Sequence, residues 1–117
     1  MSSGKSKFHL QQIESLILNI LNNTLKYEIY NDELKHVSFT YVVLSKDYIH
    51  LKVFVDCFDR KTINKKIKLL NNAKGVFRTA IAKKTKLYRA PNIIFLSDVT
   101  IDKNLHIEEI LNKLNNI

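Results

Sequence analysis

The sequence predicts one α+β domain whose elements follow in the order α-β-β-α-α-β-α. Three observations predict it. Apolar residues recur at helical spacing in three parts of the chain, and two adjacent segments alternate apolar and polar residues as strands do. The third observation is length, because 117 residues suffice for one modest core. No linker or repeat interrupts the pattern, so we expect a flexible tail over 1–7 and a single domain over 8–117.

Residues near 8–28 are expected to form an amphipathic helix. Their apolar side chains fall on one stripe at helical spacing: Leu10, Ile13, Leu16, Ile17, Ile20 and Leu21. The polar run Asn31-Asp32-Glu33 indicates the break after this helix.

Two strands are predicted next, over 36–44 and 48–57, because both segments alternate with period two and are rich in β-branched and aromatic residues. The short polar link between them, Ser45-Lys46-Asp47, predicts a hairpin. The alternation predicts two apolar rows. They are Val37, Phe39, Tyr41 and Val43 in the first strand, and Ile49, Leu51, Val53, Val55 and Cys57 in the second.

A helix, a break and a second helix are predicted between residues 60 and 86. Asp59 is a suitable N-cap for the first helix. The stripe of Ile63, Ile67 and Leu70 stops at 71–75, which predicts a bend at Ala73 and Gly75. In the second helix we expect Phe77, Ala80 and Ile81 to face inward, and Arg78, Ala82 and Lys86 to share another face.

A third strand and a last helix complete the predicted fold. Pro91 ends the helical region, and the short apolar run 92–97 follows as a strand. The last helix is predicted from Ile107, Ile110, Leu111 and Leu114, which recur at helical spacing.

The positive charge is concentrated in one segment. The chain has a formal net charge of +8. Residues 60–89 contain 11 Lys and Arg and no Asp or Glu, whereas the other 87 residues hold 8 basic and 11 acidic side chains. A segment without carboxylates has no local ion-pair partners. We therefore favour an anion-binding surface over a merely solvated lysine-rich face.

Residue types that carry catalysis or bind cofactors are sparse. Two glycines, Gly4 and Gly75, are too few for a P-loop or a dinucleotide fingerprint. The four histidines lack metal-ligand spacing, and Cys57 has no second thiol to form a disulfide or a metal site. No apolar run approaches the ~20 residues of a membrane span. We expect a cytoplasmic protein with no metal or cofactor that is not an enzyme.

The helix–break–helix followed by a strand resembles the K-homology RNA-binding unit, in which a tight turn lets the nucleic-acid backbone approach. Ala73-Lys74-Gly75-Val76-Phe77-Arg78, then Leu87-Tyr88-Arg89-Ala90-Pro91 and a strand ending near Asp98, is similar to the signature of the bacterial ribosome-binding factor A family. The hairpin and the segment 107–111 resemble the same family, so the likeness covers residues 10–114. This chain departs from it at Asn31-Asp32-Glu33, where the family often has Asp-Pro-Arg.

The resemblance implies a K-homology (type II-like) domain with a three-stranded sheet, helices on one face and a C-terminal helix. It implies a monomer that binds the small (30S) ribosomal subunit and its 16S rRNA, and acts in late subunit maturation, precursor processing and cold adaptation. Together with the basic segment it makes these residues candidates for RNA binding: Lys65, Lys68, Lys74, Gly75, Arg78, Lys83, Lys86 and Arg89.

Two other functions stay open at this point. An RNA-processing nuclease would need paired carboxylates or metal ligands, and the sequence shows neither pattern. A general nucleic-acid binder of the K-homology type could use the same basic surface. Tyr88, beside cations, could stack on an unpaired base, although packing against the protein explains it equally well.

Overall fold

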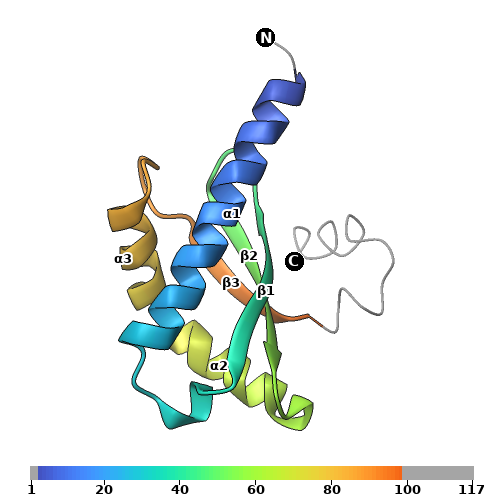
Figure 1. Ribbon diagram of the computed structural model, residues 1–117, viewed down its shortest axis with the longest axis vertical. Coiled ribbons are helices and arrows are strands. Elements are labelled where there is room, and N and C mark those ends of the chain that lie inside the picture. Colours follow the sequence, from blue (N-terminus) through green and yellow to red (C-terminus); the bar gives the residue numbers. More distant parts are fainter. Residues whose placement is uncertain (1–2, 99–117) are drawn as a thin grey trace.

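The computed structural model describes residues 3–98, with side chains from residue 9 onward. The order α-β-β-α-α-β is confirmed, while the helix predicted from Ile107 to Leu114 lies outside the described residues (Figure 1). The elements are α1 (Ser3–Glu28), the 3-10 turn η1 (Asp32–Leu34), β1 (Val37–Leu44), β2 (His50–Cys57), the 3-10 turn η2 (Arg60–Thr62), α2 (Ile63–Asn72), α3 (Lys74–Lys84) and β3 (Asn92–Ser97).

α1 begins earlier than the sequence predicts. It starts at Ser3 rather than near residue 8, and therefore includes most of the segment 1–7 that was expected to be a flexible tail. The flexibility of that segment stays a prediction, since helical backbone alone does not measure motion.

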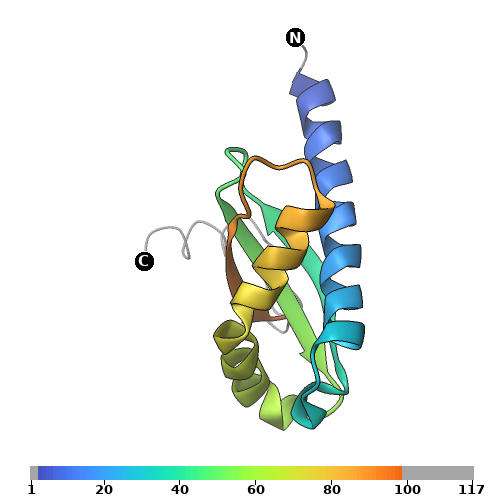
Figure 2. The ribbon, with the colours of Figure 1, turned by 90° about the vertical axis from the view of Figure 1, so that its left-hand side faces the viewer.

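The sheet has the strand order β1-β2-β3. β1 and β2 pair antiparallel as the predicted hairpin, whereas β2 and β3 pair parallel, so the chain crosses over between them through α2 and α3. The three α-helices of the described residues cover the same face of the sheet, and Figure 2 looks onto them with the strands behind α3. This is the arrangement of a K-homology-like domain.

Aromatic rings form the centre of the core between helices and sheet. The rings of Phe39 and Phe77 lie 5.5 Å apart, and those of Phe77 and Phe95 lie 5.4 Å apart. α1 adds Ile17 and Leu21, both fully buried. Each of these side chains comes from a predicted apolar stripe or row, so the periodicity places the core correctly at these positions.

A β-bulge in β1 makes half of its predicted inward row wrong. Phe39 pairs with Val55 and Tyr41 with Phe54, so Thr40 is an extra residue that shifts the register. Beyond the bulge the alternation reverses. Val42 and Leu44 are buried against the helices, and Tyr41 is 43% exposed.

Asn22 of α1 holds the strand at this bulge. Its amide nitrogen donates to the carbonyl oxygen of Phe39 at 3.1 Å, and its oxygen accepts from the Phe39 N–H at 3.0 Å. The side chain thus takes the place of a neighbouring strand for one residue, and it joins α1 to the irregular part of β1.

Arg60 ties together the ends of β2 and β3. Its guanidinium donates at 2.7 Å to Asp56 and at 2.7 Å to Asp98. Asp59 accepts from the Lys61 N–H at 3.1 Å and so caps η2, and α2 begins afterwards at Ile63. Asp59 is thus a cap at the predicted place, but it caps the 3-10 turn, and the N-cap position of the helix α2 is Thr62.

Candidate nucleic-acid interface

The helix break lies at a single residue. α2 ends at Asn72, α3 begins at Lys74, and Ala73 between them has φ −100° and ψ 9°. Gly75 lies in the first turn of α3 and does not have a positive φ. A Cβ atom at Gly75 would meet nothing within 4 Å. The bend therefore depends on Ala73, and Gly75 keeps the surface beside it open.

A groove runs along α3 beside the end of α1. It encloses about 480 Å³ and contains Gly75, Thr79 and Lys83 on its α3 side. Glu28 of α1 lies on the opposite side, with its carboxylate 3.9 Å from the Nζ of Lys84. The fold thus brings two predicted RNA-binding positions, Gly75 and Lys83, into one groove.

Lys65 forms an ion pair with Glu33 of η1. Its Nζ lies 2.7 Å from Oε1 of Glu33. The hydrogen bond from Lys65 and its positive charge lower the pKa of the Glu33 carboxyl below its ordinary value. Lys65 is therefore partly neutralised, while Lys68, one turn further along α2, is exposed.

Arg78 binds the protein's own backbone. Its Nε donates to the carbonyl of Pro91 at 3.2 Å, and a terminal nitrogen donates to that of Ala90 at 3.3 Å. These bonds anchor the segment that leads into β3. The structure thus gives Arg78 a positioning role, which sequence analysis did not predict because the acceptors are backbone atoms.

Lys86 does not share a helical face with Arg78, so that prediction is wrong. α3 ends at Lys84, and Thr85 turns to extended backbone with φ −124° and ψ 168°. Lys86 therefore lies in the loop after α3. Arg89 follows in the same loop, with its guanidinium carbon 5.8 Å from the centre of the Tyr88 ring.

The remaining cations are spread from the break to the loop after α3. Lys74 is half-buried directly after Ala73. Among the described residues, five of the predicted RNA-binding side chains besides Arg78 form no ion pair. They are Lys68, Lys74, Lys83, Lys86 and Arg89. They offer positive charge that no described carboxylate neutralises, along α2, along α3 and in the loop that follows.

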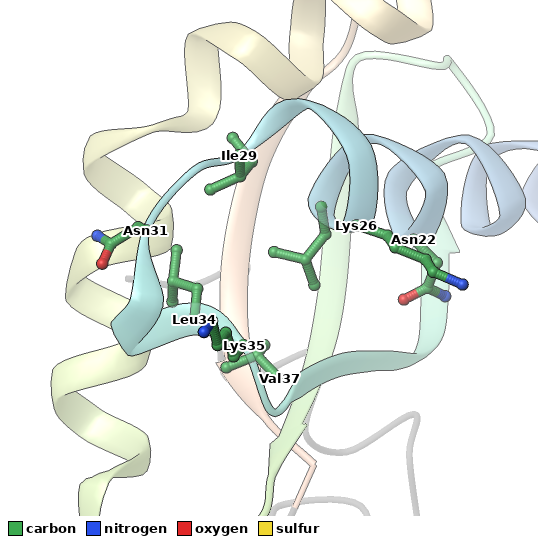
Figure 3. Close-up of a pocket in the computed structure, with 8 residues that line it drawn as sticks. Asn22, Lys26, Ile29, Asn31, Leu34, Lys35 and Val37 are labelled. Atoms are coloured by element: carbon green, nitrogen blue, oxygen red, sulfur yellow. The ribbon is translucent and has the colours of Figure 1, made fainter.

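A separate hollow of about 390 Å³ lies between the end of α1 and η1 (Figure 3). Ile29, Leu34 and Val37 give it apolar walls. Its polar residues already have structural partners. Asn31 caps η1, and Lys35 pairs with Asp32 at 3.3 Å. We therefore assign this hollow to the packing of η1 and not to a ligand.

Within residues 9–98, no three His, Cys, Asp or Glu side chains gather as a metal site would require. The thiol of Cys57 is buried and donates to the carbonyl of Asp59 at 3.0 Å. None of the helices described is both long and apolar enough to cross a bilayer.

Comparison with known proteins decides the family. The family model described as Ribosome-binding factor A matches residues 9–111. The chain belongs to this family. A ribosome-binding factor A from Malacoplasma penetrans is 37% identical over 109 residues, which cover 93% of this chain and 94% of the relative.

Solved structures of the family have the same fold. A crystal structure of ribosome-binding factor A from Thermus thermophilus aligns with a TM-score of 0.68 at 23% identity, covering 75% of this chain and 94% of that one. A second Thermus thermophilus chain, a homology model fitted into a cryo-electron-microscopy map of a 30S–ribosome-binding factor A complex, aligns with a TM-score of 0.60. That chain is 23% identical, and the alignment covers 73% of this chain and 90% of that one.

Proposed function

We propose that this chain binds the small ribosomal subunit through its 16S rRNA and promotes late maturation of that subunit, including processing of the rRNA precursor. It acts by binding, as a cytoplasmic monomer, and not by catalysis. The observation that carries the proposal is the set of cations without described carboxylate partners along α2, along α3 and in the loop after α3, on a chain that belongs to the ribosome-binding factor A family.

The geometry is suited to RNA backbone. Each unpaired Lys or Arg that meets a phosphate releases condensed counterions, and this release gives nucleic-acid binding its affinity and its dependence on salt. Gly75 and Lys83 line a groove where no Cβ obstructs the start of α3. A phosphodiester chain can therefore approach the helix backbone at Gly75 while Lys83 and Lys74 neutralise its charge.

The fitted relative supports the choice of partner. The Thermus thermophilus chain was fitted into a map of a 30S complex, and it shares the fold of this chain. A general nucleic-acid binder of the K-homology type would use the same cations but would not prefer one subunit. Competition between duplex DNA and purified 30S subunits for the labelled protein separates the two functions, since preference for 30S supports the first and equal competition supports the second.

Depletion of the protein tests the maturation step. We expect 16S rRNA with unprocessed ends to accumulate in free small subunits. The effect should be largest in the cold, where misfolded RNA rearranges slowly. Fully processed ends after depletion at low temperature would contradict the proposal.

A further inference from the structure

A second binding surface lies at the far end of α3 from the break. A pocket of about 440 Å³ forms where the first half of α1, the β1–β2 turn and the loop after α3 meet. It is lined by apolar, aromatic and cationic side chains: His9, Ile13, Leu16, Tyr48, Lys84, Thr85, Lys86, Leu87 and Tyr88. No carboxylate of residues 9–98 lines it.

Two side chains that line the pocket are exposed although they lie beside buried or half-buried neighbours. Tyr88 is 96% exposed although it follows the half-buried Leu87, and Leu16 is 45% exposed although its neighbour Ile17 is fully buried. Leu16 belongs to the apolar stripe of α1, but the described residues leave it uncovered. An apolar floor beside a freely exposed ring is the combination that a flat, partly apolar ligand fits.

Tyr48 is held in the pocket wall by a strained backbone. Its φ of 63° makes it the one non-glycine residue with positive φ among the described residues, and bulky side chains rarely adopt this conformation. The turn is fixed around it. Ser45 Oγ donates to Asp47 at 2.6 Å, and the Tyr48 N–H donates to the Ser45 carbonyl at 2.9 Å. Such strain is often found at functional sites, and here it accompanies an aromatic ring in the pocket wall.

The positive charge around the pocket favours a ligand that carries a phosphate. Lys84 and Lys86 line it, and the guanidinium of Arg89 lies beside the Tyr88 ring. Rings that offer a stacking face beside cations match the two parts of a nucleotide, since the base stacks on the ring and the phosphate meets the cation. Lys84 lies 3.9 Å from the Glu28 carboxylate, whereas Lys86 and Arg89 form no ion pair among the described residues. A neutral apolar peptide would gain nothing from these two cations.

We propose that this pocket binds an unpaired nucleobase of single-stranded RNA, with the base stacked on Tyr88 beside Tyr48 and its phosphates near Lys86 and Arg89. The inference rests on the proposed function for the source of the RNA, but it concerns a different pocket from the groove at Gly75, and only Lys84 lines both. The proposal predicts that the protein binds a single-stranded RNA segment. This segment lies next to the part of the RNA whose phosphate backbone contacts α3.

The test uses the full-length protein and a fluorescein-labelled hexanucleotide of single-stranded RNA. A matched hexamer, in which abasic sugars replace the bases, keeps the same phosphates and removes the stacking surfaces. We expect the complete hexamer to bind at least about fivefold more tightly than the abasic one. Tyr88→Ala should abolish this difference, while Tyr88→Phe should keep it.

Tyr30→Ala is the matched control, because Tyr30 is 93% exposed and lies outside the pocket. Both alanine variants should keep the wild-type melting temperature. The proposal would be overturned if the wild-type protein bound the two hexamers equally. It would also be overturned if Tyr88→Ala and Tyr30→Ala lost equal affinity for the complete hexamer. Binding of wild-type protein to 30S subunits, measured in parallel, tests the proposed function independently, because it does not depend on the hexamer.

Discussion

The Nζ of Lys65 lies 2.7 Å from Oε1 of Glu33, so that α2 and η1 are joined across 32 residues of sequence. Both side chains are largely exposed, at 63% and 46%, and an exposed pair of this kind contributes little to stability. Its main consequence is electrostatic, because the Glu33 carboxylate partly neutralises Lys65, a cation of the basic segment 60–89.

Removing this carboxylate should strengthen RNA binding. In Glu33→Gln, Lys65 is free to meet a phosphate, so affinity for 30S subunits should rise and the slope of log affinity against log salt should steepen by about 0.7–0.9. Asp32→Asn is the matched control, because it removes one charge from the same turn but frees Lys35 instead. Equal effects of the two variants would mean that net charge alone matters and that Lys65 has no contact.

The same pair predicts a dependence on pH. Lys65 lowers the pKa of Glu33, so the charged carboxylate is favoured in the folded protein. Its stabilisation is therefore complete above the ordinary carboxyl pKa, and it is lost as the pH falls through the lowered pKa of the folded state. In Lys65→Gln, NMR titration of the Glu33 carboxyl carbon should give a midpoint closer to the ordinary value. An unchanged midpoint would contradict the pairing.

Replacing Arg78 should act mainly on the stability of the protein and less directly on RNA binding. Arg78→Ala removes two hydrogen bonds from a charged donor to the carbonyls of Ala90 and Pro91. We expect a loss of about 1–3 kcal/mol in the free energy of unfolding by urea. Lys83→Ala, on the exposed side of the same helix, should unfold as the wild type does and bind RNA more weakly. A wild-type urea midpoint for Arg78→Ala would contradict the anchoring role.

Replacing Asn22 of α1 should lower the stability of the protein. In Asn22→Ala the N–H and carbonyl of the buried Phe39 lose the partners that Asn22 supplies at the bulge, which should cost about 1–3 kcal/mol of unfolding free energy. Asn23→Ala, at the exposed neighbouring position, should change it by less than about 0.5 kcal/mol. If both variants are equally stable, the Asn22 bonds do not hold the strand.

Local pattern predicted most of the fold. The strand over 92–97, the hairpin and the inward positions of Phe77, Ala80 and Ile81 follow from periodicity, because each depends only on nearby residues. The reversal of β1 beyond Thr40 could not be predicted in this way. A bulge is stabilised by a partner from another element, here Asn22, and alternation alone does not reveal it.

The candidate site was predicted by composition but not by geometry. The carboxylate-free segment correctly located a group of unpaired cations, among them Lys68 and Lys83. It did not reveal that Lys65 pairs with Glu33, or that Arg78 binds backbone carbonyls, since these partners lie far away in sequence. Tyr48 was missed as a pocket residue because its role depends on a left-handed turn conformation that aromatic residues seldom adopt.

Sedimentation with separated ribosomal subunits tests the central claim most directly. At low salt the wild-type protein should travel with 30S subunits, and less of it with 50S subunits or complete ribosomes. A variant with Lys68, Lys74 and Lys83 changed to Gln should keep its melting temperature but remain mostly at the top of the gradient. Free sedimentation of the wild type, or undiminished association of the triple variant with 30S subunits, would contradict the account.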